Sequence, residues 1–383
     1  MKEYKIKDLL TIRNGRDHKH LGNGVFPVYG SGGIMRYAND YLYNKPSILL
    51  PRKGTLDNIQ YCDSPFWCVD TTYYSEVNEE LVNPYYLYRY LNLLDLRNLD
   101  SGTALPSMTF DSYYQIKVKL PNIEIQNKIA KVLYSIDQKI SLNTRLNAEL
   151  EAMAKQLYDY WFVQFDFPDE NGKPYKSSGG KMVWNEKLKR EIPEGWEVKN
   201  LFYIAKFTNG IACQNYRPTD ENKLPVIKIK EMHDGFGSDT EFTTTNIPEA
   251  VKVYNKDVLF SWSASLEVML WSSGKGALNQ HIFKVTSNNG YPKFFYYFQL
   301  KDYVNIFKKI AEARKTTMGH ITQDHLEQST IAVPPDLELP NLLEKRLCPI
   351  MDNIVKLNEE RSYLTRLRDS LLPMLMNGQV TIE

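Results

Sequence analysis

The chain contains two copies of one pattern, and this duplication constrains the fold more than any other feature of the sequence. Residues 105–121 resemble residues 318–334, with a separation of 213 positions. Four further segments match in the same order at separations of 192 to 215 positions. Solenoid repeats recur about every 20–50 residues, so a period of about 190 residues indicates a duplicated domain. The sequence therefore predicts two similar modules in one chain.

Each copy consists of a globular part followed by a long helix. The globular parts, residues 1–121 and 196–335, contain short apolar runs bounded by turn residues, which is typical of strands. Residues 122–165 lack Gly and Pro and predict the first long helix, and residues 336–383 predict a second helix with a tail. Between the copies, residues 166–195 are rich in Pro, Gly, Ser and charge and predict an ordered connector.

Apolar residues recur at heptad spacing in both helical regions, and we expect them to form one seam. A helix of about 40 residues spans about 60 Å, which is longer than a domain of about 120 residues is wide. The globular part of the same copy cannot cover such a helix along its whole length. We therefore favour packing of the two long helices on each other over packing of each helix on its own globular part alone. The predicted seam consists of Ile129, Val132, Ile136, Asn143, Leu146, Leu150, Met153, Leu157, Leu347, Ile350, Ile354, Leu357, Leu364 and Leu371.

The predicted fold class is α+β. We expect two similar mixed α/β domains, separated by two long antiparallel helices that form a coiled-coil spacer, with a pseudo-twofold relation between the copies. Asn143, a polar residue in the seam, would set the register of the two helices. The sequence Asn377-Gly378 predicts an αL cap that ends the second helix. In the connector, Phe165 and Trp184 are expected to dock as apolar anchors.

Composition narrows the functional classes. The chain has 383 residues, of which 43% are hydrophobic, enough for two cores. No apolar run approaches 18 residues and no signal peptide is evident, so we expect a soluble protein of the prokaryotic cytoplasm. The four Cys residues lack metal-site spacing and are expected to be reduced and buried. The formal net charge is +1 and no segment is a basic block. DNA binding would therefore require charges sorted onto one face, or partner chains.

Motifs that resemble catalytic sites have simpler interpretations. Residues 83–86, Asn-Pro-Tyr-Tyr, resemble an adenine methyltransferase motif, but Pro84 also suits the first turn of a helix. Residues 274–276 lack the spacing of a phosphate-binding loop. Asp169 and Glu197 with Lys199 could form a nuclease site, although their segments are predicted as connector and strand. We therefore predict no catalytic residue.

The sequence also offers no convincing metal site. His18 and His20 lie in one loop without a matched second pair of ligands, so a polar surface loop is favoured over zinc binding. We expect no metal and no cofactor on this chain.

Polar and basic residues at the predicted strand ends suit DNA. Arg pairs with guanine and Asn or Gln with adenine, whereas Lys and Thr suit phosphate. For any single residue, a solvated surface is an equally good interpretation. The candidate DNA-binding residues are Arg13, Asn14, Arg16, Arg36, Arg52, Lys53, Thr71, Thr72, Gln214, Arg217, Lys228, Lys230, Asn279, Gln280, His281, Arg314, Lys315, Thr317 and His320.

Several long motifs give the chain a family resemblance. They are Leu-Tyr-Asp-Tyr-Trp-Phe-Val-Gln-Phe at 157–165, the connector at 172–180 with Ile-Pro-Glu-Gly-Trp at 192–196, and the tail at 364–373 with Asn-Gly at 377–378. Over its whole length the chain resembles the specificity (S) subunit of type I restriction–modification enzymes. Recognition domains vary freely in such a family, so no DNA contact is carried over by motif.

The resemblance implies a non-catalytic DNA-reading subunit. Its two target-recognition domains would each read one half of a bipartite, asymmetric double-stranded DNA target. The helices would set the spacing and dock two methyltransferase (M) subunits, and motor-nuclease (R) subunits would join for cleavage. S-adenosylmethionine, ATP and Mg²⁺ would belong to those partners, which make the complex an adenine-specific methyltransferase and ATP-dependent endonuclease.

Two alternatives remain open at this point. One is a specificity chain of another restriction-type or phage-defence system, which different copurifying partners would reveal. The other is an enzyme, such as a nuclease, for which cleavage of plasmid with Mg²⁺ that depends on Lys199 would be the sign.

Overall fold

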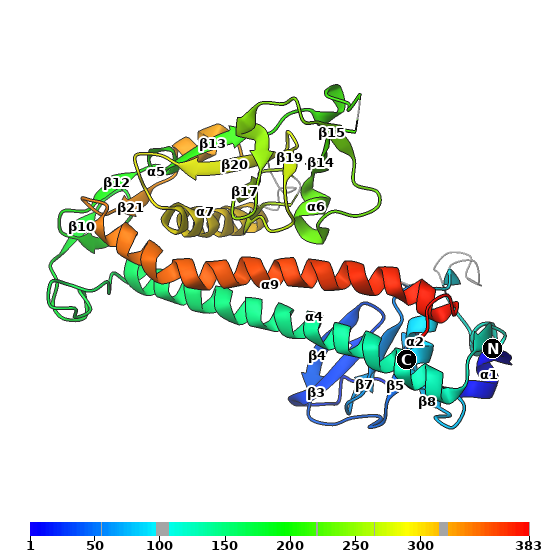
Figure 1. Ribbon diagram of the computed structural model, residues 1–383. Helices are drawn as coiled ribbons and strands as arrows, with labels where there is room; N and C mark the ends of the chain where they lie inside the picture. Colours follow the sequence, from blue (N-terminus) through cyan, green and yellow to red (C-terminus); the bar gives the residue numbers. More distant parts are fainter. Residues whose placement is uncertain (55, 97–106, 220, 264, 314–320, 383) are drawn as a thin grey trace. The chain divides into compact units, whose positions relative to one another are not determined.

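The computed structural model describes the chain except residues 55, 97–106, 220, 264, 314–320 and 383 (Figure 1). The chain divides into two compact units. Unit 1 comprises Met1–Lys139 and Leu364–Glu383, and unit 2 comprises Ile140–Tyr363. Each unit holds one globular part together with a stretch of both long helices, α4 (Ile123–Tyr158) and α9 (Glu338–Met376).

Among its described residues, unit 1 contains three small sheets and three short helices in addition to the long ones. In the first sheet β1 (Lys2–Lys5) pairs with β9 (Lys117–Leu120). The second sheet has the order β2 (Leu10–Asn14), β8 (Thr72–Val77), β5 (Ser47–Pro51) and β6 (Gln60–Cys62). The third has the order β4 (Gly33–Ala38), β3 (Asn23–Gly30) and β7 (Trp67–Cys68). The helices are α1 (Ile6–Leu9), α2 (Pro84–Leu91) and α3 (Phe110–Tyr114). The core of this unit joins β5 and α2 to α4, through buried residues such as Ile48, Leu87 and Leu133.

Unit 2 repeats this plan with longer connections. In its first sheet β12 (Glu197–Lys199) pairs with β21 (Ile331–Val333). A second sheet has the order β13 (Ala205–Asn209), β20 (Ile282–Ser287), β17 (Val258–Ser261) and β18 (Glu267–Leu270). A third has the order β15 (Phe242–Thr244), β14 (Lys223–Ile227), β19 (Gly276–Leu278) and β16 (Lys252–Val253). The helices are α5 (Leu201–Ile204), α6 (Ile229–Asp234), α7 (Lys293–Ala313) and α8 (Gln323–Glu327), with 3₁₀ turns at Cys213–Asn215 and Glu249–Val251.

The element order confirms the duplication. Strands β2-β8-β5 of the first copy and β13-β20-β17 of the second have the same antiparallel order. In both copies a parallel pair, β3 with β7 or β14 with β19, builds a neighbouring sheet. Each copy then closes with a strand that pairs with its own first strand, β9 with β1 and β21 with β12, before the long helix begins.

The two long helices run antiparallel within each unit. In unit 2, the Asn143 amide donates to Glu360 (2.8 Å), and the Asn147 amide donates to Asn358 (2.7 Å). In unit 1, Arg368 donates to Asp137 (3.0 Å). Residue numbers therefore increase along α4 as those of their partners on α9 decrease, which confirms the predicted antiparallel packing. Asn143 is fully buried, and a shift in the register of α4 against α9 would break its hydrogen bond to Glu360.

One residue of the predicted seam was placed wrongly. Ile129, Leu347 and Ile354 are buried, but Met153 is 56% exposed. An ideal α-helix drifts about 20° per heptad against a strict seven-residue repeat, so a fixed column leaves the contact face after a few turns. Ala154 takes the buried position in that turn. The other predicted seam residues on α4 and α9 are buried or half-buried.

The helix ends follow local rules. At the end of α9, Gly378 has a φ of 71°, its N–H donates to the Leu375 carbonyl (3.3 Å), and the Gln379 N–H donates to Met374 (2.9 Å). These two bonds form a Schellman motif and confirm the predicted αL cap. Helix α4 ends in a π-helical turn, Asp159–Val163.

The connector is ordered by aromatic packing. Phe165 is buried, and Phe167 stacks on Trp196 with ring centroids 5.5 Å apart. The expected anchor Trp184 is instead 56% exposed, because it lies in a two-stranded hairpin, β10 (Met182–Asn185) with β11 (Arg190–Pro193), that no other sheet covers in the described structure. No helix in the described part of the chain has the length and apolar character that a bilayer span needs.

Candidate nucleic-acid interface

Three segments of the first globular domain meet where its strands end. Backbone hydrogen bonds join the end of β2, the end of β5 and the turn between β7 and β8, and we call this place the first corner. The bonds run from Gly15 N–H to the Thr72 carbonyl (3.2 Å), from Arg16 to Cys68 (2.9 Å), from Arg52 to Thr71 (2.9 Å) and from Met108 to Arg52 (3.0 Å). Side chains far apart in sequence, Arg16, Arg52 and Thr71, are thereby brought together.

The first corner carries positive charge that is not neutralised within the described structure. Arg16 and Lys53 are exposed, and no carboxylate of the described residues forms an ion pair with either. Arg52 donates to the Asp70 carbonyl (3.4 Å) and lies 5.9 Å from the Tyr73 ring. Arg13, by contrast, is held by Glu76 through two bonds of 3.1 Å. The corner thus has the charge that a DNA contact needs, whereas Arg13 is already paired.

The second globular domain builds the same corner with the same bonds. They run from Gly210 N–H to the Ile282 carbonyl (3.0 Å), from Ile211 to Leu278 (3.0 Å), from Trp262 to His281 (3.4 Å) and from Ile321 to Trp262 (3.1 Å). Each is the counterpart of one bond of the first corner, in the same order. The backbone frame of the corner is therefore common to both copies.

The side chains on this common frame differ. Ile211 stands where the first corner has Arg16, Trp262 where it has Arg52, and His281 where it has Thr71. The Trp262 indole N–H donates to the Asn209 side-chain oxygen (3.3 Å), and its ring lies 5.8 Å from that of His281. One corner presents cations, and the other presents an aromatic and apolar surface.

Several candidate DNA-binding residues are used inside the protein. Thr72, the first residue of β8, is fully buried, which argues against its predicted contact with DNA. Asn279 is only 7% exposed and donates to the neighbouring Gln280 side chain, which likewise argues against a contact. Arg36 donates to the carbonyls of His18 and Leu21 and so holds a loop.

The remaining candidates are spread over the two domains. Lys228 pairs with Glu241 at 2.5 Å, and Lys230 pairs with Asp239, so these charges are internally compensated. Asn14, Gln214 and Arg217 are exposed, and Gln280 is half-buried. Arg314, Lys315, Thr317 and His320 lie outside the described residues.

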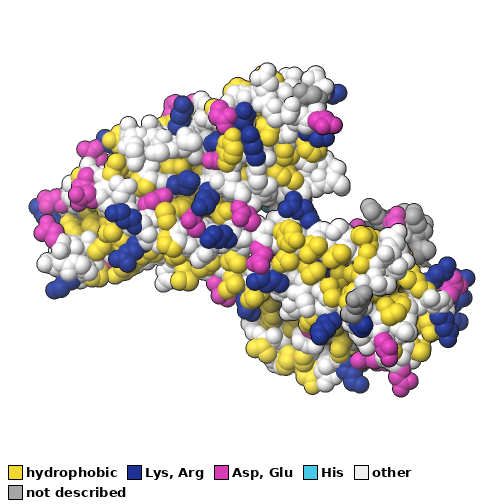
Figure 2. Space-filling view, viewed as in Figure 1, with side chains coloured by type: hydrophobic (Ala, Val, Ile, Leu, Met, Phe, Trp, Pro, Cys, Tyr) yellow, Lys and Arg dark blue, Asp and Glu magenta, His cyan; other side chains and the backbone are white. Residues whose placement is uncertain are grey.

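Trp262 and Asn209 were missed by residue-type reasoning, which searched for cations and amides in loops that follow strands. The duplication in the sequence could have identified both residues. Residues 85–88 match residues 294–297 at a separation of 209 positions, and a separation of 210 positions sets Trp262 opposite Arg52. On the face shown in Figure 2, basic side chains lie among acidic ones, in keeping with the near-zero net charge.

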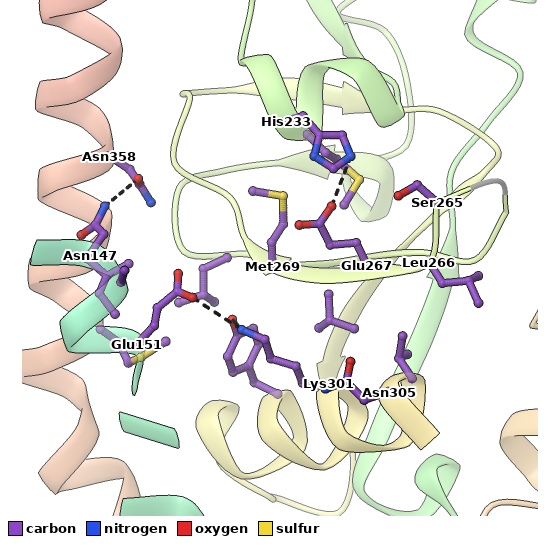
Figure 3. A pocket seen from close by; sticks show the side chains of 18 of the residues that line it. Asn147, Glu151, His233, Ser265, Leu266, Glu267, Met269, Lys301, Asn305 and Asn358 are labelled. Carbon is purple, nitrogen blue, oxygen red and sulfur yellow. Dashed lines mark hydrogen bonds and ion pairs between the residues drawn. The ribbon is translucent and has the colours of Figure 1, made fainter. Parts of the chain in front are cut away.

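A separate recess in unit 2 has a volume of about 520 Å³ and lies among α4, α6, α7, β18 and α9 (Figure 3). Lys301 lies 3.7 Å from Glu151, and His233 lies 3.2 Å from Glu267. The side-chain oxygen of Asn147 is buried and has no hydrogen-bond partner in the described structure. The Lys301–Glu151 pair links α7 of the second globular domain to α4, whereas the His233–Glu267 pair lies within that domain.

The motifs that resemble catalytic sites have structural roles. Asn83 caps helix α2 by accepting from the Tyr86 N–H, with Pro84 in the first turn. Lys199 pairs with Glu197 on the surface. Burial raises the pKa of the Cys68 thiol to about 12 and that of Cys213 to about 11, so both are protonated and unreactive at neutral pH. Among the described residues, no group of three or more His, Cys, Asp or Glu could hold a metal ion.

Comparisons with known proteins agree with this architecture. The profile of the type I restriction modification DNA specificity domain matches residues 1–152 and 193–362. The MjaIX specificity subunit of Methanocaldococcus jannaschii is 26% identical over 310 residues, covering 78% of this chain and 69% of the relative. The HindI specificity subunit of Haemophilus influenzae is 25% identical over 341 residues, covering 73% and 72%.

The fold has a solved counterpart. A crystal structure of a type I restriction-modification S subunit from M. genitalium superposes with a TM-score of 0.63 at 15% identity, covering 98% of this chain and 95% of that chain. The family profile matches both copies of the duplicated module and most of the chain. The chain therefore belongs to the family of type I restriction–modification DNA specificity subunits.

Proposed function

We propose that each globular domain of this chain reads one half of a bipartite, asymmetric double-stranded DNA target, and that the chain itself catalyses no reaction. The observation that carries the proposal is the pair of corners, which share one backbone frame but present different side chains. A common frame with different side chains is what two readers of different sequences require, because base contacts specify and the scaffold only positions. S-adenosylmethionine, ATP and Mg²⁺ would then serve the partner subunits.

Exchange of one domain tests this division of labour. Replacing residues 1–121 with the first globular domain of another family member should change one half of the methylated target and leave the other half unchanged. The reason is that unit 1 and unit 2 have separate cores. Methylation would be mapped across a genome after expression with the methyltransferase subunit. A change in both halves at once would contradict the proposal.

The helices carry a surface that fits a partner protein. On α4 and its π-helical end, Leu142, Met153 and Tyr160 are 37%, 56% and 36% exposed. The spacing of 11 residues places Leu142 and Met153 within about 20° of one another around a helix of 3.6 residues per turn, and Tyr160 follows in the π-helical turn. Exposed apolar side chains on α4 and its π-helical end support a role in docking a partner protein. We propose that a methyltransferase subunit docks here, with two such subunits and the motor-nuclease subunits completing the complex.

A charge placed on this surface should weaken the assembly. In the Met153→Glu variant, copurification of the methyltransferase subunit should fall at least tenfold, because a carboxylate loses its hydration when the interface closes. The matched control is Arg346→Glu, an exposed position on α9, which should copurify normally. Equal copurification of the two variants would exclude this face of α4 as the docking surface.

The alternative of another restriction-type or phage-defence system differs in its partners. Purification of the chain from its host with its bound proteins distinguishes the two, since adenine methyltransferase and motor-nuclease subunits are expected here. Incubation of the purified chain with plasmid and Mg²⁺ should give no cleavage.

A further inference from the structure

We infer that three positions of each corner are exchangeable specificity determinants: Arg16, Arg52 and Thr71 in the first domain, and Ile211, Trp262 and His281 in the second. The inference rests on the proposed function and assigns it to particular side chains. It follows from the equivalence of the four backbone bonds, whose lengths differ between the corners by no more than 0.5 Å. The frame is built by main-chain groups, so the side chains can change without moving it.

The chemistry of the two corners points to different bases. Arg16 and Arg52 present guanidinium groups, which pair with the O6 and N7 acceptors of guanine in the major groove. Neither arginine forms an ion pair in the described structure, so neither must break a salt bridge to reach DNA. We therefore assign a G·C pair to the first corner.

The second corner favours an A·T pair. Ile211 and Trp262 replace both guanidinium groups with apolar surface, which suits the methyl group of thymine. The Trp262 indole N–H holds the side-chain oxygen of Asn209, which orients the amide and leaves its NH₂ group available to an acceptor. Asn14 occupies the matching place in the first domain, at the end of β2. The amide is thus common to both corners, and the three exchanged positions carry the difference.

Transplanting the first corner into the second domain tests the inference. The triple variant Ile211→Arg, Trp262→Arg, His281→Thr would be assembled with the methyltransferase subunit, and its methylated sites would be mapped. Methylation of the original target should fall more than tenfold, and the second half-site should change toward G·C at one or two positions. The first half-site should stay unchanged. Ile306→Arg, an exposed position on α7 of the same domain, is the matched control and should keep the original target.

The reciprocal variant guards against a folding defect. Arg16→Ile, Arg52→Trp, Thr71→His should alter only the first half-site, toward A·T. Melting curves of both variants identify any that is unfolded. Methylation of the original target at an unchanged rate by folded variants would overturn the inference, and so would changes in the half-site of the other domain. If the unaltered chain directs no bipartite methylation, the proposed function fails instead, so the two failures are distinguishable.

Discussion

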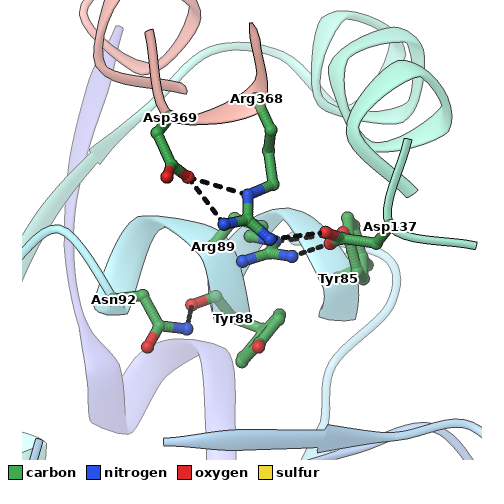
Figure 4. A network of polar contacts seen from close by, with 7 residues as sticks. All are labelled: Tyr85, Tyr88, Arg89, Asn92, Asp137, Arg368 and Asp369. Carbon is green, nitrogen blue, oxygen red and sulfur yellow. Dashed lines mark hydrogen bonds and ion pairs between the residues drawn. The ribbon is translucent and has the colours of Figure 1, made fainter. Parts of the chain in front are cut away.

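Replacing Asp137 with alanine should lower the free energy of unfolding of unit 1 by about 3 kcal/mol, near the lower end of the range for a broken buried ion pair. The Asp137 carboxylate accepts from Arg368 (3.0 Å) and contacts Arg89 and the Tyr85 hydroxyl (Figure 4). It joins α4 to α2 and to α9. The Arg89 and Arg368 side chains are only 11% and 21% exposed, so removal of the carboxylate leaves two cations largely out of water.

The lower end of the range is expected because Arg368 keeps a second partner, Asp369, at 2.7 Å. For a unit of this size, a loss of about 3 kcal/mol lowers Tm by roughly 6–12 °C, which calorimetry resolves. Asp369→Ala is the control, since that carboxylate is 57% exposed and an exposed pair contributes at most about 1 kcal/mol. Equal destabilisation by the two variants would show that the Asp137 network is not what secures α2 to the helices.

The triple replacement Arg89→Met, Asp137→Leu, Arg368→Met sharpens this test. It removes the three buried charges together and leaves only the exposed Asp369 without its partner, so stability should return to within about 1 kcal/mol of the original or rise above it. Recovery would show that the loss in Asp137→Ala arises from stranded charge. A triple variant as unstable as the single one would instead point to lost packing around Tyr85.

The repeat made much of the fold predictable, because matching segments must build matching elements. Residues 69–74 align with residues 278–283, and these segments contain the first residues of β8 and β20, which are interior strands of matching sheets. The helix end at Gly378 was equally readable, since only a residue tolerant of positive φ suits that cap. Fixed heptad columns failed at Met153 because the drift of a real helix accumulates over several turns.

The site was predictable only in part, because residue type does not reveal what a side chain contacts. Arg36 looked like a DNA ligand but holds two carbonyls of its own loop, and Thr72 faces the core. Trp262, which the sequence analysis did not single out, directly follows β17 and lies beside His281. Such positions become visible when the backbone bonds of the two copies are compared, since these bonds define equivalence where side chains share nothing.

Lengthening both helices together should change the spacing of the DNA target. We expect an insertion of four helical residues after Asn147 in α4, with four more after Leu357 in α9, to lengthen each helix by about 6 Å. Both insertions fall on the same side of the Asn143–Glu360 and Asn147–Asn358 bonds, so this polar layer keeps its register. An insertion after Asn147 alone would force the rest of the seam to repack and should cost stability.

The added length corresponds to one or two base pairs, because DNA rises about 3.4 Å per base pair. Four residues also rotate the following part of a helix by about 40°, close to the rotation of roughly 35° that one base pair adds to DNA. The non-specific spacer between the half-sites should therefore grow by one or two base pairs, while both half-sites stay the same. Mapping of methylated sites with the assembled variant gives the answer directly. An active double-insertion variant that keeps the original spacing would show that α4 and α9 do not set the distance, and the interface with DNA or with the methyltransferase subunits would then have to set it.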